Sequence, residues 1–222
     1  MIQLNSITKE FRSGRGYVQA IRDVSFVIKT GDAVAITGKS GSGKTTLLTC
    51  IGGLERPEDG NVISFDSDIY ALSARDLSLF QRRHIGFVFQ HGNLLSYLTV
   101  YENIAFPLIL NGKRKPAIMK RVSELLEKIG LPDAGAAMPH ELSGGEIQRV
   151  SVARAIAHLP RALLADEPTA SLDTATGESL VKLLFDMGRD SGCTMILSTH
   201  DPNVSALANK VLEIRDGAIV KE

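Results

Sequence analysis

Hydrophobic residues near the start of the chain alternate with polar ones, as they do along strands that bury one face. Ile2, Leu4 and Ile7 follow this pattern and residues 24–28 form a second apolar run, so strands are predicted here. Residues 33–37 form a continuous apolar run that ends in a Gly/Ser cluster, which is typical of a buried parallel strand. Further strands are expected at 62–65, 85–89, 162–165 and 194–198, with a closing hairpin at 211–214 and 218–220.

Helical periodicity replaces alternation in the middle of the chain. Between residues 118 and 129 apolar side chains recur on one helical face, and Gly130 with Pro132 ends that helix. The members of this face are Ile118, Val122, Leu125, Leu126 and Ile129. Other helices are expected at 44–54 and around Leu180, Leu183, Leu184 and Met187. The pattern predicts an α/β protein with mostly parallel strands and a single domain over 1–222, with a core at about 1–90 and 158–222 and a helical insert at about 91–157.

Composition excludes several classes of protein. Of 222 residues, 25 are basic and 25 acidic, and 44% are hydrophobic, which is typical of a globular chain with a buried core. The balanced charge argues against a dedicated nucleic-acid binder and against membrane binding by charge alone. Cys50 and Cys193 are far apart and lack His or Cys neighbours at ligand spacing, which argues against a disulfide framework or zinc site and favours a reducing compartment.

The sequence predicts neither a secretion signal nor a membrane span. The start of the chain has no basic region followed by an apolar run. The most apolar long window, residues 98–110, is interrupted by Glu102, Asn103 and Pro107, whereas a spanning helix needs about 20 mostly apolar residues. Work at a membrane would therefore require a partner.

A phosphate-loop pattern lies between an expected strand and an expected helix. Its residues, Gly38, Lys39, Ser40, Gly41, Ser42, Gly43, Lys44 and Thr45, match G-x-x-x-x-G-K-[ST], and Thr46 adjoins them in the predicted ATP site. The glycines let backbone N–H groups converge on phosphate oxygens, and the helix adds its positive end. Lys44 is expected to meet the β- and γ-phosphates, and the Thr45 hydroxyl to bind Mg²⁺. The alternative, an ordinary glycine-rich turn, is disfavoured by the flanking elements.

Two acids, Asp166 and Glu167, follow the apolar run at 162–165. A parallel strand presents its carboxyl end to the ligand crevice, so Asp166 can reach magnesium or a bound water. Glu167 faces elsewhere and can polarise a water for attack on the γ-phosphate. Taken alone, the pair could equally be solvated acids at a strand end.

A second glycine-rich helix start follows at Leu142, Ser143, Gly144, Gly145 and Glu146. Such a start is a second anion site, and one chain has only one phosphate loop. The second site is therefore expected to serve a nucleotide held by another chain, which requires a dimer.

With these residues in place, the chain resembles the nucleotide-binding subunits of ATP-binding cassette (ABC) transporters. Six elements stand in the family's order: the phosphate loop, Gln90 of the Q-loop, the signature at 142–146, Asp166-Glu167, the D-loop Ser171-Leu172-Asp173, and the switch histidine His200. The resemblance implies a P-loop NTPase core with an antiparallel β subdomain and a helical insert. It also implies ATPase activity with ATP and Mg²⁺, and a head-to-tail homodimer with two ATP molecules between phosphate loop and opposite signature.

The resemblance assigns a role to residues that have ordinary interpretations by themselves. Gln90 is placed as a metal ligand between magnesium, water and the transporter contact, although it could be a solvated strand end. His200 is placed at the γ-phosphate, although a lone histidine is more often structural. Asp173 is placed at the dimer contact, although it could simply be the N-cap of the following helix.

Within the family, the stretch from residue 85 to 108 looks like ATPases that serve lipoprotein release, macrolide export and the cell-division-associated transporter. Methionine-type importer ATPases share much of it but often carry a C-terminal regulatory domain, for which no room is expected after Glu222. The resemblance therefore favours export or extraction. It implies a cytoplasmic subunit, peripheral on the inner face of the membrane through permease subunits. An apolar groove for the permease is expected from Tyr97, Leu98, Phe106, Leu108 and Leu110, with core packing as the alternative.

The sequence departs from the family at two positions. Phe11 stands where the family usually has an adenine-stacking Tyr, and its ring keeps a face for stacking; Tyr17 is a weaker candidate. Glu146 stands where the signature usually ends in Gln. Ser143 and Glu146 have capping-box spacing, so we expect Glu146 to fold back onto its own helix start and to leave Ser143 and Gly145 free for phosphate.

Two other classes of protein account for fewer of the motifs in this sequence. A soluble ABC-type ATPase acting on DNA would carry a long coiled coil between Gln90 and Leu142, and no heptad run is present there. Ribosome-acting members usually carry two cassettes in one chain. A small-molecule P-loop kinase leaves the signature unexplained. No nucleic-acid partner is therefore expected.

Overall fold

The computed structural model describes residues 1–14 and 16–221, which form two compact units. The first unit is built from Met1–Gln81 and Thr194–Glu222, and the second from Arg82–Cys193. The expected helical insert at about 91–157 lies within the second unit, together with two strands and a further long helix.

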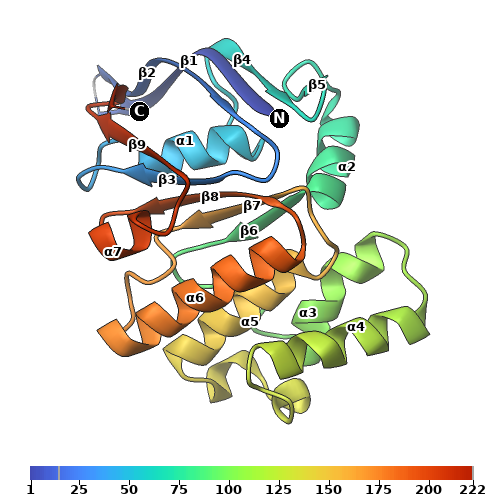
Figure 1. The fold of residues 1–222 in the computed structure, drawn as a ribbon. Coiled ribbons are helices and arrows are strands. Elements are labelled where there is room, and N and C mark those ends of the chain that lie inside the picture. Colours follow the sequence, from blue (N-terminus) through green and yellow to red (C-terminus); the bar gives the residue numbers. More distant parts are fainter. Residues whose placement is uncertain (15, 222) are drawn as a thin grey trace. The chain divides into compact units, whose positions relative to one another are not determined.

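One sheet of the first unit is antiparallel and has the strand order β2-β1-β4-β5 (Figure 1). Its strands are β1 (Ile2–Ser13), β2 (Gly16–Ile28), β4 (Asp59–Ser64) and β5 (Ser67–Asp68). Ile2, Leu4 and Ile7 are all fully buried although Ile7 breaks the spacing of two. The register shifts between Leu4 and Ile7, where Ser6 has a positive φ of 49°. This irregularity returns Ile7 to the buried face.

The other strands of the first unit run in the order β10-β9-β3-β8. β3 (Ala33–Thr37) lies between β8 (Thr194–Thr199) and β9 (Lys210–Arg215) and is parallel to both. β10 (Ala218–Lys221) pairs antiparallel with β9. Val34, Ala35 and Ile36 are completely buried, as expected of a parallel strand that is covered on both faces.

Three helices accompany these strands. α1 (Lys44–Ile51) directly follows the loop after β3, and it buries Leu47 and Leu48. α2 (Ala74–His84) ends in the second unit, and the short α7 (Pro202–Ser205) follows β8.

The second unit combines a parallel strand pair with helices (Figure 1). The strands are β6 (Ile85–Val88) and β7 (Ala162–Asp166); the helices are α3 (Val100–Leu110), α4 (Lys115–Lys128), α5 (Gly144–Ile156), α6 (Thr174–Asp190) and the 3-10 turns η1 (Ala134–Ala136) and η2 (Pro139–Glu141). α5 packs closely on β6, since a Cβ at Gly86 would lie 2.3 Å from the carbonyl oxygen of Ala155. The apolar face predicted between residues 118 and 129 is buried throughout.

The structure confirms the α/β class, with an antiparallel sheet beside parallel strands flanked by helices. The periodicity does not reveal α2, because Phe80 is the one residue of that helix that is buried. The predicted helix at 44–54 ends earlier, at Ile51, since Gly52 and Gly53 follow and Gly53 has a φ of 73°. Residues 93–99, expected to begin the helical region, are irregular.

None of the helices in the described residues is long and apolar enough to span a membrane. Cys50 lies in the first unit and Cys193 in the second, and both are buried free thiols.

Candidate nucleotide site

The phosphate loop connects β3 to α1 as predicted, and two of its glycines are required by close backbone contacts. A Cβ at Gly38 would lie 2.3 Å from the carbonyl oxygen of Ile214, and one at Gly43 would lie 2.4 Å from that of Ala20. Gly43 is also the N-cap of α1 and has a φ of 107°. Larger residues at these two positions would therefore displace the loop from the neighbouring strands.

Lys44 begins α1 with a side chain that is almost completely buried. Its Nζ donates hydrogen bonds to the carbonyl oxygens of Gly38, at 2.9 Å, and Lys39, at 3.1 Å. These bonds hold the ammonium group against the loop, where a phosphate bound by the loop would meet it. Thr45, the expected magnesium ligand, is exposed at the helix start, and Thr46 is half-buried.

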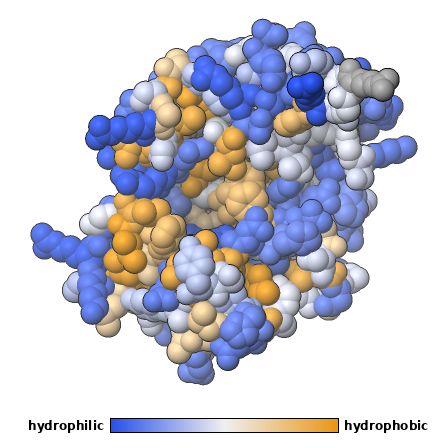
Figure 2. All heavy atoms as spheres, turned by 180° about the vertical axis from the view of Figure 1, so that it is seen from behind, coloured by the Kyte–Doolittle hydropathy of each residue, from blue (hydrophilic) through white to orange (hydrophobic). Residues whose placement is uncertain are grey.

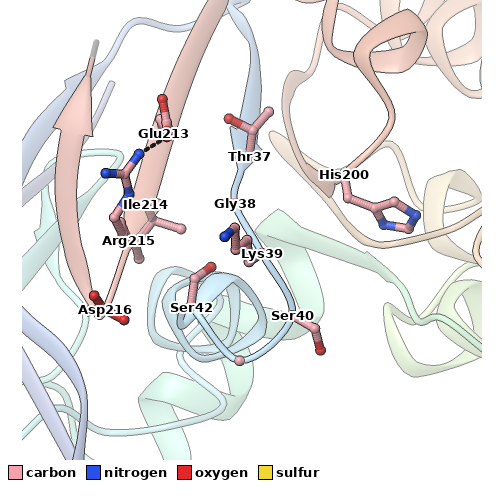
Figure 3. Close-up of a pocket in the computed structure, with 11 residues that line it drawn as sticks. Thr37, Gly38, Lys39, Ser40, Ser42, His200, Glu213, Ile214, Arg215 and Asp216 are labelled. Atoms are coloured by element: carbon pink, nitrogen blue, oxygen red, sulfur yellow. Dashed lines mark hydrogen bonds and ion pairs between the residues drawn. The ribbon is translucent and has the colours of Figure 1, made fainter.

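His200 and the phosphate loop line one pocket of about 720 Å³ (Figure 3). The sheet explains this meeting of distant residues. β3 and β8 are parallel and pair Thr37 with Thr199, so Gly38 and His200 leave neighbouring strands at the same edge. The predicted residues in the lining are Gly38, Lys39, Ser40, Gly41, Ser42 and His200.

The same pocket is lined by residues that the sequence analysis missed. Glu213, Ile214, Arg215 and Asp216 come from the end of β9 and the turn after it. Figure 3 shows Glu213 and Arg215 on the opposite side of the loop from His200, joined by an ion pair of 3.1 Å. The one available signal was the Asp216-Gly217 turn, which indicated a hairpin but not its place beside β3.

In the second unit, Asp166 and Glu167 stand at the carboxyl end of β7. All of β7 is buried, and Asp166 is 7% exposed. Glu167 has a positive φ of 40°, so the chain turns sharply between the two acids and their side chains face different ways. Val88 pairs with Ala165 in the parallel β6–β7 ladder, so Gln90 leaves the same edge as the two acids.

The sequence predicts three oxygen donors for magnesium, the side chains of Thr45, Gln90 and Asp166. A hydroxyl, an amide oxygen and a buried carboxylate are the hard oxygen ligands that Mg²⁺ prefers, and Mg²⁺ usually takes its remaining ligands from phosphates and water. The donor set therefore fits Mg²⁺. Within the described residues, no three His, Cys, Asp or Glu side chains gather into a separate metal site.

The signature start and the D-loop lie together in the second unit. Ser143 is the N-cap of α5, and Asp173 is the N-cap of α6, where its Oδ1 accepts from the Thr176 N–H at 3.0 Å. A Cβ at Gly145 would lie 2.7 Å from Cγ2 of Thr176, so a larger residue would force the Thr176 side chain to move. The structure thus confirms the capping interpretation of Asp173, and its place at a dimer contact stays a prediction.

Glu146 folds back onto the start of its own helix, as its spacing predicted. Its carboxylate and Ser143 form a reciprocal capping box, and these hydrogen bonds hold the pKa of Glu146 below its ordinary value. One part of the expectation was wrong: the Ser143 hydroxyl is not free, because it donates to Glu146 Oε2 at 2.6 Å. A phosphate at this helix start would have to replace or share that bond.

Phe11 lies in β1 with its side chain 40% exposed, and Lys9 Nζ is 5.1 Å from the ring centroid. Lys9 is itself held by Glu55 and Glu58, at 2.8 and 3.0 Å. A cation beside a half-exposed ring favours one orientation of that ring. Tyr17, the weaker candidate, is 73% exposed on β2.

The five residues expected to line a permease groove differ in their exposure. Tyr97, Phe106 and Leu110 are exposed, whereas Leu108 is 4% exposed and packs in the core. For Leu108 the groove prediction was therefore wrong, and core packing is the correct interpretation. Ile109, which was not predicted, is 57% exposed on the same helix. The face drawn in Figure 2 shows apolar side chains gathered among hydrophilic ones.

The fold and the site define a phosphate-loop α/β domain with a second glycine-rich helix start. The model of the family described as ABC transporter matches residues 21–170. An uncharacterized ABC transporter ATP-binding protein of Mycobacterium tuberculosis is 42% identical over 222 residues, covering 99% of this chain and 89% of the relative. A methionine import ATP-binding protein of Yersinia pestis is 44% identical over 223 residues, and the alignment covers 100% of this chain but 65% of that protein.

Solved structures that superimpose on this chain belong to the same family. The ATP-binding cassette MJ0796, in a dimeric post-hydrolysis state bound to ADP and Pi, superimposes with a TM-score of 0.93 at 37% identity, covering 100% of this chain and 97% of that one. CbiO1 from Clostridium perfringens, part of an ABC transporter complex, superimposes with a TM-score of 0.86 at 29% identity, covering 99% and 86%. The chain belongs to the ABC transporter family and is its ATP-binding, ATP-hydrolysing domain, which uses ATP with Mg²⁺.

Proposed function

We propose that this chain works as a head-to-tail homodimer, in which the phosphate loop of one copy and the signature of the other enclose each ATP. The pocket formed by the phosphate loop and His200 carries the proposal, because the family's chemistry requires these groups together. The start of α5 at Ser143 and Gly144 is exposed and offers N–H groups to an anion. The dimeric state of MJ0796 supports the same arrangement.

In the proposed reaction the protein positions groups and neutralises charge, and it forms no covalent bond to phosphate. The phosphate loop and Lys44 hold the phosphates. Thr45, Gln90 and Asp166 would hold Mg²⁺, which would supply positive charge to offset the charge of the phosphates. Glu167 orients or deprotonates the attacking water, and His200 contacts the γ-phosphate. The buried Asp166 and the sharp turn at Glu167 support this division of roles between adjacent acids.

Mixing two inactive variants tests the head-to-tail arrangement. Lys44→Ala removes the phosphate-binding cation, and Ser143→Asp keeps an N-cap residue while placing a carboxylate where the partner's phosphate would bind. Each variant alone should lose ATP turnover. A mixed dimer has one intact site, so random pairing of equal amounts should recover about a quarter of the wild-type rate. If two folded variants recover nothing on mixing, each site is completed within one chain and the proposal fails.

We further propose that the dimer drives export or extraction of a lipoprotein- or macrolide-type substrate through permease subunits that contact α3 and the loop before it. Tyr97, Phe106 and Leu110 are exposed there and could bury apolar area against a partner. The sequence from 85 to 108 supports this direction. The second candidate is methionine import, which the names of relatives such as the Yersinia pestis protein favour.

The direction can be tested with the permease subunits that co-purify with the tagged chain from detergent-solubilised membranes. The complex is placed in liposomes, and ATP turnover is measured with a lipid-modified peptide, a macrolide or L-methionine. Stimulation by the lipid-modified peptide or the macrolide supports the proposal. Stimulation by L-methionine alone would establish the import alternative, and co-purified nucleic acid without membrane protein would contradict both.

A further inference from the structure

The segment between β6 and α3, residues 89–99, has irregular backbone whose polar groups find few partners within the segment. Buried backbone groups need hydrogen bonds, so their partners must come from elsewhere. In the second unit these partners are side chains of two helices, α3 and α5. The segment contains Gln90, so the groups that hold it also decide where Gln90 lies.

Two side chains of the signature helix donate to four carbonyl oxygens of this segment. Gln148 Nε2 donates to the carbonyl oxygens of Phe89, at 3.2 Å, and Gln90, at 2.5 Å. Arg154 donates through Nη1 to Asn93 and through Nη2 to Gly92, both at 2.8 Å. Gln148 is 1% exposed, so the Nε2 group that makes these two bonds lies in the protein interior.

The backbone of the segment is shaped to meet Arg154. Gly92 and Asn93 have φ values of 71° and 47°, so two consecutive residues adopt the left-handed conformation. A Cβ at Gly92 would lie 2.7 Å from Cγ2 of Ile147, which shows how closely α5 approaches here. Asn93 adopts a conformation that is uncommon for a residue with a side chain, and the guanidinium of Arg154 stabilises it by binding both carbonyls.

The positive charge of Arg154 is directed at the carbonyl oxygens of Gly92 and Asn93. Arg154 is half-buried, and this burial lowers the pKa of its guanidinium below the ordinary value. Within the described residues the guanidinium donates to these two carbonyl oxygens, and it forms no ion pair with a carboxylate. A half-buried cation without an acid beside it loses part of its hydration, and the hydrogen bonds to residues 92 and 93 compensate for that loss.

The far end of the segment is attached to α3 by Asn103, which is fully buried. Its side chain accepts from the Leu95 N–H at 2.9 Å and donates to the carbonyl oxygens of Leu95, Leu98 and Thr99, at 3.0 to 3.1 Å. Residues 89–93 are therefore tied to α5, and residues 95–99 to α3. The part that carries Gln90 is the part tied to α5.

We propose that Gln148 and Arg154 are positioning residues that fix Gln90 to the signature helix, so that nucleotide bound at Ser143 by the opposite copy sets the position of Gln90. The inference rests on the proposed roles of Gln90 and Ser143. α5 is one continuous helix from Gly144 to Ile156, so a displacement at its start is carried to Gln148 and Arg154. Gln90, the proposed metal ligand of one ATP site of the dimer, then responds to the nucleotide bound in the other ATP site.

A double-mutant cycle between Arg154 and Gln90 tests this coupling in the full-length chain. Arg154→Met should raise the Mg²⁺ concentration for half-maximal ATP turnover roughly tenfold, as loss of an orienting residue does at metal sites. Binding of a fluorescent ATP analogue without Mg²⁺ should not change. If Arg154 acts through Gln90, the Gln90→Ala/Arg154→Met double variant should be no worse than Gln90→Ala alone.

Arg121 provides a matched control in the same unit. Its Nε and Nη2 donate to the carbonyl oxygens of Ala157 and Ile156, at 3.2 and 3.4 Å, at the opposite end of α5 from Ser143. Arg121→Met also removes a guanidinium that binds backbone carbonyl oxygens, here at the end of α5, but it leaves the contacts of residues 89–93 unchanged. The Mg²⁺ dependence of this variant should therefore equal that of the wild type. An equal shift in Arg121→Met and Arg154→Met would reduce Arg154 to a general stabiliser of α5 and overturn the inference.

Other results of these experiments also support or overturn the proposal. If Arg154→Met does not fold, two other variants apply. Arg154→Lys keeps the charge but replaces the planar fork of the guanidinium with a single ammonium nitrogen, and Gly92→Ala pushes the segment away from Ile147. Either should reproduce the Mg²⁺ shift. Fully multiplicative effects in the cycle would overturn the positioning role while leaving Gln90 as a ligand. An unchanged Mg²⁺ dependence in Gln90→Ala would instead refute the proposed role of Gln90 itself, and the inference with it.

Discussion

The carboxylate of Glu146 accepts hydrogen bonds from both the backbone N–H and the hydroxyl of Ser143, at 2.8 and 2.6 Å. The Ser143 hydroxyl accepts in turn from the Glu146 N–H at 3.4 Å. A residue that could repel a triphosphate is thereby used to complete the helix start. The negative charge at residue 146 is compatible with nucleotide binding as long as this arrangement persists.

Replacing Glu146 by Gln should have a small effect on catalysis. The amide oxygen of Gln can accept the same hydrogen bonds, and only the charge interaction with the helix start is lost, worth about 0.3–1 kcal/mol at most. We expect a slightly lower melting temperature and ATP turnover within about threefold of the wild type. Steady-state turnover at saturating ATP checks this. A sharp increase in turnover would mean that Glu146 repels the phosphate and slows the enzyme.

The capping carboxylate should also make stability depend on pH. Folding lowers the pKa of Glu146 from its ordinary value of 4.5, so its contribution is present above that value and is lost as the pH falls through the lowered one. The melting temperatures of wild type and Glu146→Gln should therefore differ at about pH 7 and converge once the pH falls below the lowered pKa. Thermal unfolding of both proteins across this range measures the effect, and a difference that persists in acid would contradict it.

Replacing Glu167 by Gln should separate binding from hydrolysis. The amide keeps the shape of the side chain but cannot take a proton from water, so turnover should fall by about 10²–10⁴-fold. Nucleotide binding to the phosphate loop should remain, and an ATP-bound dimer should accumulate in gel filtration. Near-normal turnover in this variant would remove Glu167 from the reaction.

Removing the Phe11 ring should weaken ATP binding. Stacking of a base on an aromatic ring contributes about 1–3 kcal/mol, which corresponds to a loss in affinity of roughly five- to 150-fold for Phe11→Ala. Inorganic tripolyphosphate lacks the base, so its binding should not change. Tyr17→Ala, on the adjacent strand, is the control and should bind ATP normally. Unchanged ATP affinity in Phe11→Ala would remove the adenine assignment.

Much of the fold and of the nucleotide site was predictable because the signals are local. The apolar run at 33–37, the glycines after it and Lys44 follow one another in the sequence, and the structure confirms that strand, loop and helix. The capping box of Ser143 and Glu146 is likewise set by residues three apart. Such features depend on neighbouring residues alone.

The parts that were missed depend on contacts between distant residues. Arg215 joins the pocket only because β9 pairs with β3. Gln148 and Arg154 bind backbone carbonyls, and every residue has one, so no residue type marks their partners. Leu108 was placed at the surface because an apolar helix shows little difference between its faces, and tertiary packing decides which side is buried.

The burial of both native thiols has a practical consequence for experiments on this molecule. Burial raises the pKa of Cys50 to about 12 and that of Cys193 to about 11, so neither forms the reactive thiolate at neutral pH. A cysteine introduced on the surface should thus be the one that takes up a maleimide dye under native conditions. Spectroscopic labels can therefore be attached at a single position without first replacing the two native cysteines.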